Sequence, residues 1–335
     1  MKIAFVQSHP IIVSSDGVLS QAITWKKLLE LRGHKVQLIN MWEKNDWKGF
    51  DSILFFGFSH YTENCIMWLK DINPNFAVAP ILDPGINNVN AYKIYSHIGC
   101  RKLHLSSHYY ALRKIAPSVK LFFARSEYEK RFLTKGWDIN AEKIAIIPLS
   151  FSHAIGTDID KKKYVKEPFC LHISLLADER KNVKRLIEAA RKHNFQLILG
   201  GKLRNEQEKQ LLQSWISNAP NIEYKGFLST AQMNDLYSRA QVFALPSIKE
   251  GVGIVALDAA IMGCDVIITS MGGPKEYYKQ MAKVVDPYSV DEIGKAVSFF
   301  LNGNTFQPQL KEHIQRNYSL EIIAEKLESS LKSIL

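Results

Sequence analysis

The chain alternates between short apolar runs and stretches whose apolar residues recur with helical spacing. In the first part of the chain the apolar runs have the length of strands, and Leu19, Ala22 and Leu28 mark the longest helical stretch. The expected strands are 1–7, 35–40, 51–58 and 76–83, and the expected helices are 18–33 and 63–72. Because this order favours a parallel sheet with helices on both faces, we predict a doubly wound α/β unit.

The same rhythm restarts after residue 168. Here the expected strands are 168–175, 195–201, 221–227, 242–247 and 265–270, and the expected helices are 182–193, 206–218, 230–240 and 254–263. The stretch between the two halves is polar, charged and without periodicity, which is typical of a linker. We therefore predict a first domain over 1–150, a linker over 151–168 and a second domain over 169–318. Residues 319–335 predict an amphipathic helix whose apolar face could pack back on the first domain.

Hydropathy and cysteine positions narrow the class of protein. No apolar run approaches the ~18 residues of a membrane span. The opening stretch MKIAFVQSHPIIV predicts a strand and not a signal peptide. Cys65, Cys100, Cys170 and Cys264 are scattered, as expected of free thiols in the cytoplasm and not of a zinc site.

The positive charge is concentrated in the first half. The formal net charge is +10, and residues 1–168 carry 23 Lys and Arg against 15 Asp and Glu. This excess favours an anionic partner such as a phospholipid surface, a lipid diphosphate or nucleic acid, although a solvated basic surface explains it equally well. Residues 92–114 mix basic residues with Tyr, Ile and Leu, which indicates either contact with the face of an anionic membrane or an ordinary pair of basic helices.

Residues 246–276 carry the strongest chemical signal. They read as a strand end, a glycine loop, a helix, a second strand and a second glycine loop. Gly251 and Gly253 let a ligand approach the backbone, and the following helix would point its free N–H groups at an anion. Glu250 and Asp258 add carboxylates, which commonly bind sugar hydroxyls. The stretch therefore predicts a site for a phosphorylated, hydroxyl-rich ligand.

The amino-acid sequence of this stretch also resembles that of a known family. ALPSIKEGVGIVALDAAIMGCDVIITSMGGPKEYY is similar to the signature of retaining glycosyltransferase family 4, with its PS-x-x-EG motif, a second acid eight residues later and a GG-x-x-E motif. ERKNVKRLIEAA resembles the phosphate-binding turn of that family, and YKGFLSTAQMNDLYSRAQVFALPS resembles its base-contacting loop. The resemblance implies the GT-B architecture, in which two Rossmann-like doubly wound domains face each other across a cleft.

The resemblance also implies residue roles in the second domain. Glu250 would contact the donor sugar, and Asp258 would contact the ribose; the alternative for both is an ordinary carboxylate of a helix. Lys181 and Arg180 would contact the diphosphate, and the alternative for them is a solvated basic turn. The remaining donor or nucleotide contacts implied are Gly251, Val252, Gly253, Ile254, Gly226 and Phe227. Two positions depart from the family, because Leu176 stands where an Arg is frequent and Asp258 is one methylene shorter than the usual Glu.

In the first domain the resemblance is looser. Asp16 and Gly17 stand in the loop that often carries a glycine pair in the family, and Asp83 stands near the place of a sugar-contacting His. We take these three residues as candidates for the acceptor or sugar side. A capped helix start at Asp16 is the structural alternative.

The implied function is retaining transfer of a hexose or related sugar from a nucleotide diphosphate sugar, a UDP-sugar being favoured over a GDP-sugar, without a metal. The implied acceptor is a glycan or a lipid-linked glycan in bacterial-type surface polysaccharide or glycolipid synthesis, in the cytoplasm or at the inner face of the membrane. The alternatives are a non-catalytic glycosyltransferase-like partner subunit and a nucleotide-sugar epimerase. Nucleic acid is not expected as a partner, because no helix-turn-helix or aromatic-basic RNA motif stands out.

Overall fold

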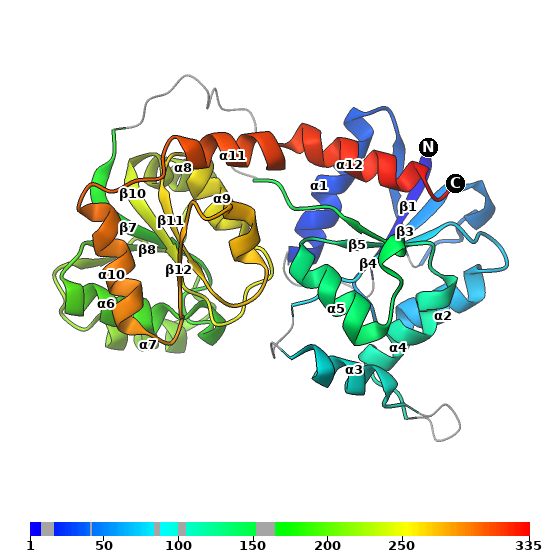
Figure 1. The fold of residues 1–335 in the computed structure, drawn as a ribbon, viewed down its shortest axis with the longest axis horizontal. Helices are drawn as coiled ribbons and strands as arrows, with labels where there is room; N and C mark the ends of the chain where they lie inside the picture. The colour runs from blue at the N-terminus through cyan, green and yellow to red at the C-terminus, as the bar shows by residue number, and fades with distance from the viewer. Residues whose placement is uncertain (8–16, 41, 84–87, 100–104, 152–164) are drawn as a thin grey trace. The chain divides into compact units, whose positions relative to one another are not determined.

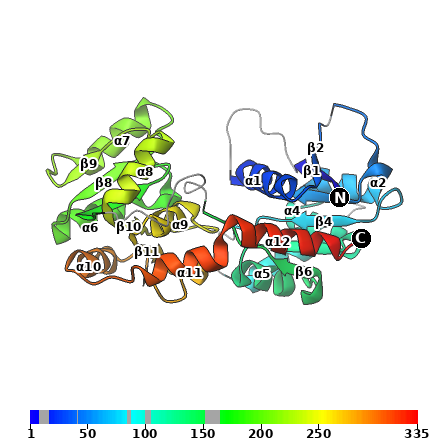
Figure 2. The same cartoon turned by 90° about the horizontal axis from the view of Figure 1, so that it is seen from above.

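The computed structural model describes residues 1–7, 17–40, 42–83, 88–99, 105–151 and 165–335. The chain divides into two compact units (Figures 1 and 2). Unit 1 comprises Met1–Leu149 together with Leu320–Leu335, and unit 2 comprises Ser150–Ser319. Each unit is built on a six-stranded sheet in which every pair of neighbouring strands is parallel. The predicted doubly wound α/β class is therefore confirmed.

The sheet of unit 1 has the order β2-β1-β3-β4-β5-β6. Its strands are β1 (Lys2–Gln7), β2 (Lys35–Leu38), β3 (Ser52–Phe56), β4 (Phe76–Ala79), β5 (Leu121–Ala124) and β6 (Ile144–Ile146). Its helices are α1 (Gly17–Leu31), α2 (His60–Leu69), α3 (Val89–His97), α4 (His108–Ile115), α5 (Glu127–Trp137) and α12 (Leu320–Lys332), with short 3-10 turns η1 (Trp47–Gly49), η3 (Ala116–Ser118) and η4 (Ala141–Lys143). Every residue of β3, β4 and β5 is buried, as expected of parallel strands covered on both faces.

Different helices cover the two faces of this sheet. On one face, Trp25 of α1 and Leu327 of α12 share a core with Phe5 and Phe56 of the strands. On the other face, helices α2, α4 and α5 supply the apolar side chains that pack on the sheet. The C-terminal helix α12 lies beside α1, as Figure 1 shows, so the last residues of the chain complete the core of unit 1.

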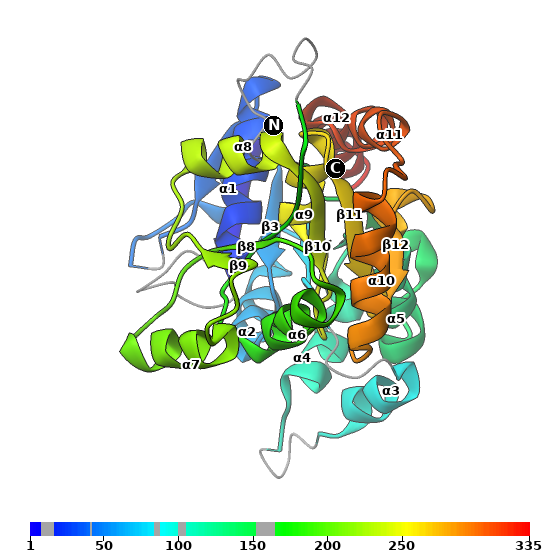
Figure 3. The same ribbon diagram turned by 90° about the vertical axis from the view of Figure 1, so that its left-hand side faces the viewer.

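The sheet of unit 2 has the order β12-β11-β10-β7-β8-β9. Its strands are β7 (Glu167–Ile173), β8 (Leu197–Gly200), β9 (Ile222–Tyr224), β10 (Ala240–Leu245), β11 (Asp265–Thr269) and β12 (Lys283–Val285). Its helices are α6 (Val183–His193), α7 (Glu206–Ile216), α8 (Thr230–Arg239), α9 (Ile254–Ile261), α10 (Val290–Leu301) and α11 (Gln309–Tyr318), with 3-10 turns η5 (Glu179–Lys181) and η6 (Pro274–Tyr278). Helices α6 and α10 pack side by side, as Figure 3 shows, and share the largest core of this unit with the strands.

The strand order of unit 2 reverses between β7 and β10. From β7 the chain moves outward through β8 and β9, and it then returns to the other side of β7 with β10, β11 and β12. In open parallel sheets, ligands bind beyond the carboxyl ends of the two strands at such a reversal. The loops after β7 and β10 are therefore the places in unit 2 where a ligand site is expected.

Within the part of the chain that the structure describes, no helix is both long enough and apolar enough to cross a bilayer.

Candidate active site

Lys181 and Glu250 meet at the strand-order reversal of unit 2. Lys181 ends η5 after β7, and Glu250 follows β10, so pairing of the two strands brings together residues 69 positions apart. The Lys181 Nζ lies 2.6 Å from the Glu250 Oε2, and the Ser247 hydroxyl donates to the same oxygen at 3.2 Å. The two charged side chains are only 19% and 13% exposed. This half-buried ion pair is a fixed cation beside a fixed carboxylate at the edge where a ligand is expected.

The loop that carries Glu250 is held from the η5 side by backbone and side-chain hydrogen bonds. The Ile248 N–H donates to the carbonyl of Arg180 at 2.8 Å. The buried Asn182 side chain donates to the Pro246 carbonyl at 2.9 Å and to the Pro287 carbonyl at 2.6 Å. Asn182 adopts a left-handed backbone conformation with φ of 59°, which Asn tolerates better than most residues. Asn182 closes the ERKN motif and was not among the residues predicted from the sequence.

The two glycine loops pack against each other. Gly253 has φ of 75° and directly precedes Ile254, the first residue of α9. A side chain at Gly272, which has φ of 79°, would place its Cβ 2.7 Å from the Glu250 carbonyl oxygen. In the first loop, between Glu250 and Gly253, Gly251 is half-buried and Val252 is buried. The second loop therefore supports the backbone of Glu250, and the start of α9 presents unpaired N–H groups beside it.

Asp258 lies in a different environment from Glu250. It is in α9 with no exposed surface. Burial is the main cause that raises the pKa of the Tyr237 and Tyr278 hydroxyls, and the negative charge of Asp258 adds to the shift of both. Asp258 therefore lies in the interior of unit 2, near two buried tyrosines. The ribose contact of its carboxylate stays a prediction.

Arg180 is beside the ion pair in sequence but makes its own pair. Its guanidinium lies 2.7 Å from the Asp178 carboxylate, and its side chain is 52% exposed. The hydrogen bond to Arg180 and the adjacent positive charges lower the pKa of Asp178. The structure therefore brings Lys181 and Glu250 together and keeps the Arg180 guanidinium on Asp178.

A buried histidine that the sequence analysis did not select lies behind this edge. His172 of β7 is fully buried, with Nδ1 2.7 Å from the Ala244 carbonyl and Nε2 2.7 Å from the Ser174 hydroxyl. Burial, assisted by the charge of Lys181, lowers the pKa of His172 to about 4. The ring is therefore neutral, Nδ1 donates to Ala244, and Nε2 accepts from Ser174. A polar residue inside the apolar run CLHISL was the available signal.

Gly226 and Phe227 lie at the end of β9, on the same edge of the sheet. Gly226 has φ of 78°, and an added Cβ would meet no atom within 4 Å. Its carbonyl accepts from the Gly201 N–H at 2.9 Å, which joins the ends of β8 and β9. The Phe227 side chain is 74% exposed. This part of the edge is therefore open.

In unit 1, the exposed Asp83 side chain contacts a charge pair after β4 whose two members, Arg125 and Glu129, are buried. The Arg125 guanidinium donates to Asp83 at 2.8 Å, and it also pairs with Glu129. A cavity of about 260 Å³ adjoins this network, and it is lined by Phe58, Ile81, Leu82, Asp83, Tyr92 and Tyr109. Ile81 has φ of 56°, a strained conformation for a β-branched residue.

The other two candidates of the first domain lie at the start of α1. Gly17 is the first residue of α1, and Asp16 lies outside the described residues.

The edge of unit 2 carries groups that suit an anion. It offers the Lys181 ammonium and the start of α9, and both stabilise negative charge. Among the described residues, no group of three or more His, Cys, Asp or Glu side chains could hold a metal ion.

This geometry defines a class of protein. The fold is that of the GT-B glycosyltransferases, with two parallel six-stranded sheets covered by helices. HepE from Anabaena, solved in complex with UDP, superposes with a TM-score of 0.73 at 16% identity, and the match covers 99% of this chain and 100% of that one. Residues 157–318, the segment that contains Lys181 and Glu250, match the family described as Glycosyl transferases group 1.

Parts of the chain are also similar to proteins whose names describe glycosyltransferases. An uncharacterized glycosyltransferase of Methanocaldococcus jannaschii is 28% identical over 190 residues, which cover 53% of this chain and 46% of that protein. A GDP-mannose-dependent monoacylated alpha-(1-6)-phosphatidylinositol monomannoside mannosyltransferase of Corynebacterium glutamicum is 28% identical over 171 residues, which cover 46% of this chain and 44% of that protein. The chain thus matches less than half the length of each of these two relatives.

Proposed function

We propose that this protein is a retaining glycosyltransferase that moves a sugar from a nucleotide diphosphate sugar to an acceptor hydroxyl. The observation that carries the proposal is the Lys181–Glu250 pair, 2.6 Å apart at the strand-order reversal of a group 1 glycosyltransferase segment. A cation is needed where the diphosphate leaves, and a carboxylate is suited to the hydroxyls of the sugar that it leaves behind. The Lys181–Glu250 pair supplies the cation and the carboxylate side by side.

The proposed chemistry needs no covalent enzyme intermediate. The bond from the anomeric carbon to the diphosphate oxygen breaks, and a bond from the same face of that carbon to the acceptor oxygen forms. The acceptor proton passes to the leaving phosphate oxygen. Lys181 and the N–H groups at the start of α9 stabilise the charge that develops on the diphosphate, and Glu250 orients the donor sugar.

We place the nucleotide at the carboxyl ends of β8 and β9, where Gly226 has room on its open side. The backbone of this edge offers the same groups to uracil and to guanine, so both donor classes belong in the first test. UDP-sugars follow from the sequence analysis and from the HepE complex with UDP. GDP-mannose follows from the name of the Corynebacterium relative.

We place the acceptor side in unit 1, at the cavity beside Asp83. Its ring-bearing lining residues, Phe58, Tyr92 and Tyr109, suit the apolar face of a sugar, and the Asp83 carboxylate suits its hydroxyls. The proposed acceptor is a glycan or lipid-linked glycan of surface polysaccharide or glycolipid synthesis. Contact of helix α3 with a membrane surface is supported by Ile94 and Ile98, which are 60% and 58% exposed, and we propose the inner face as the side of transfer.

The function is tested with a panel of donors. The purified protein is heated with UDP, GDP, ADP and their sugars, and the nucleotide of the true donor should raise the unfolding temperature, because a ligand of the folded state stabilises it by mass action. Release of nucleoside diphosphate from the same donor, accelerated by candidate acceptors, then measures turnover. The anomeric configuration of the product, assigned by NMR, tests retention.

The matched variants are Glu250→Gln and Lys181→Ala, with the exposed pair Glu206→Gln and Lys209→Ala as controls. We expect each of the first two to lower kcat about 10²-fold or more, as loss of a charge-stabilising group at the reacting centre does. The controls should keep full activity. Full transfer by Glu250→Gln would contradict the role proposed for Glu250. Absence of transfer by a native protein that binds the donor nucleotide would favour a non-catalytic partner subunit, and an epimerised sugar formed from donor alone would favour an epimerase.

A further inference from the structure

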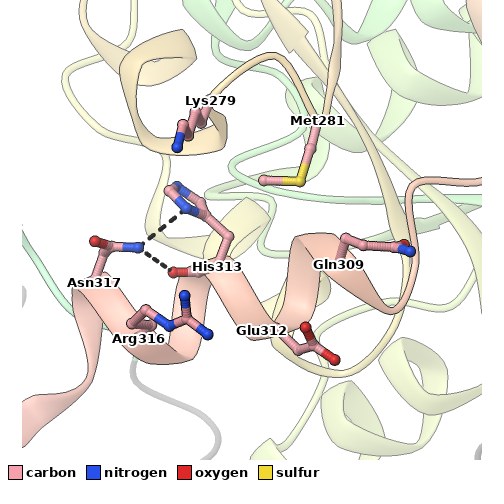
Figure 4. Close-up of a pocket in the computed structure, with 7 residues that line it drawn as sticks. All are labelled: Lys279, Met281, Gln309, Glu312, His313, Arg316 and Asn317. Carbon is pink, nitrogen blue, oxygen red and sulfur yellow. Dashed lines mark hydrogen bonds between the residues drawn. The ribbon is translucent and has the colours of Figure 1, made fainter.

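A cavity of about 410 Å³ lies in unit 2 between the connection from η6 to β12 and the helix α11 (Figure 4). Its volume is within the range of small-molecule sites. Its lining residues are Lys279, Met281, Gln309, Glu312, His313, Arg316 and Asn317. None of them belongs to the loops that carry Lys181 and Glu250, so this cavity is separate from the proposed donor site.

Two cations line this cavity from opposite walls. Lys279 follows η6, and Arg316 lies in the last turn of α11. Among the described residues, neither Lys279 nor Arg316 forms an ion pair, although most other Arg side chains of unit 2 do. Glu312 is the one carboxylate of the lining, and Figure 4 shows it at some remove from Lys279. The cavity therefore has an excess of positive charge that the protein itself does not neutralise.

His313 lies between the two cations and is held in one tautomer. Its Nε2 is 3.1 Å from the Tyr277 carbonyl and donates to it, while the Asn317 amide donates to Nδ1 at 3.0 Å (Figure 4). Partial burial lowers the pKa of His313, and the positive charges of Lys279 and Arg316 lower it further. The ring is thus a neutral group fixed in a positive environment, and it can report on the charge in the cavity.

The turn that presents Lys279 is conformationally costly. Lys279 and Gln280 are consecutive non-glycine residues with φ of 44° and 67°. A left-handed backbone is strained for non-glycine residues, and such strain clusters where function requires a particular geometry. The turn places the Lys279 ammonium over the His313 ring, as Figure 4 shows.

We propose that this cavity binds a phosphate group, carried by a small molecule or a lipid, in contact with Lys279 and Arg316. Two cations from opposite walls can share the charge of one phosphate, and the Asn317 amide and His313 ring offer polar edges beside it. Met281 and Gln309 line the rest of the volume, which leaves room for the group to which the phosphate is attached. The site does not depend on the proposed sugar transfer.

The test is a titration of the full chain with inorganic phosphate, read by NMR at the His313 imidazole. The resonance is assigned by its loss in His313→Gln. A phosphate bound beside the ring brings negative charge, so the pKa of His313 should rise with phosphate concentration in the native protein. The double variant Lys279→Ala/Arg316→Ala should lose this phosphate-dependent rise, whatever its pKa without phosphate. The control Lys295→Ala/Lys326→Ala, which removes two exposed lysines elsewhere, should retain it.

A second arm identifies the source of the phosphate. The native protein and the double variant are sedimented with phosphatidylcholine vesicles that contain or lack phosphatidylglycerol. Weaker binding of the double variant to the anionic vesicles indicates a lipid headgroup, whereas a phosphate response without this difference indicates a soluble ligand. Circular dichroism checks that both double variants are folded. An unchanged His313 titration in the native protein, or an equal response in the Lys279→Ala/Arg316→Ala protein, would overturn the proposal.

Discussion

At the scale of single residues, the two acids of the glycine-loop stretch have different surroundings. Glu250 is held at the sheet edge by the Lys181 ammonium and the Ser247 hydroxyl. Asp258, eight positions later, is enclosed in the interior near Tyr237 and Tyr278. A buried carboxylate contributes to stability through its neighbours, and it affects the donor only if the structure around it opens. This contrast separates the proposed role of Glu250 from the ribose role predicted for Asp258.

The substitution Asp258→Asn distinguishes a role of Asp258 in stability from a role in binding the ribose. Because the carboxylate is fully buried, we expect the free energy of unfolding to fall by about 1–3 kcal/mol and the KM for the donor to change little. Chemical denaturation and initial rates at varied donor concentration measure the two quantities. A KM raised tenfold or more in a protein of native stability would instead establish contact with the ribose.

The buried His172 predicts a pH dependence of stability. Its pKa is about 4 in the folded protein and near 6.5 when unfolded, so the unfolded chain binds the proton more readily. Its contribution is therefore complete above pH 6.5 and is lost as the pH falls toward 4, at up to roughly 1.4 kcal/mol per pH unit. Urea denaturation at several pH values should show that His172→Gln has a shallower slope in this window. The control is His193→Gln, because the His193 side chain is 18% exposed and His172 is fully buried. An equal slope in native and His172→Gln proteins would contradict the assignment.

At the scale of elements, the sequence predicted the long and buried pieces best. Helices 182–193 and 254–263 correspond to α6 and α9, because each has a continuous apolar face against the sheet. The strands β8 and β11 appear as uninterrupted apolar runs because both faces are covered. The edge strand β12 and the helices α10 and α11 were not predicted. β12 has only three residues, and α11 buries only Leu310 and Ile314 among its apolar residues, which is a weak signal in a polar stretch.

The candidate site shows the same limit. The glycines and charged residues of the sequence predicted the loops of Lys181 and Glu250, and the parallel βα order places both loops at the same edge of the unit 2 sheet. The hydrogen bonds of Asn182 could not be predicted, because their partners Pro246 and Pro287 are 64 and 105 positions away and are backbone carbonyls. Backbone acceptors carry no side-chain signal. The burial of Asp258 was missed for a related reason, since the family pattern gives the residue type and not its depth.

Loss of the Asn182 side chain should loosen the start of α6 and the Glu250 loop together. Asn182→Ala leaves two carbonyls without their donor and places alanine in a left-handed conformation. We expect the free energy of unfolding to fall by about 2–4 kcal/mol and kcat to fall with it. The control is Asn194→Ala, because Asn194 is also left-handed but is exposed at the end of α6. Equal losses in the two variants would show that the hydrogen bonds contribute nothing.

At the scale of the whole molecule, unit 2 is inserted between two pieces of unit 1. The chain leaves unit 1 at Leu149 and returns to it at Leu320. The returning helix α12 supplies Ile323, Leu327 and Leu331 to the same core as Trp25. Unit 2 is continuous in sequence, whereas unit 1 depends on two segments that are far apart along the chain.

This arrangement predicts a selective effect of core substitutions in α12. Leu327 has no exposed surface, so Leu327→Ala should destabilise unit 1 by about 2–5 kcal/mol and leave unit 2 unchanged. Hydrogen exchange followed by mass spectrometry should show faster exchange in β1 and β3 and native exchange in β7 and β10. The exposed Lys326→Ala on the same helix is the control. Faster exchange in both units would mean that their stabilities are coupled.

The return of α12 also bears on how the protein folds while it is being made. Domains generally fold as units during synthesis, the N-terminal one first. Here the first unit to be translated lacks a helix of its core until Leu320–Leu335 has left the ribosome, whereas unit 2 is complete once Ser319 has emerged. Unit 2 should therefore reach its native state before unit 1. A chaperone that shields nascent apolar surface would be needed longest by the N-terminal half.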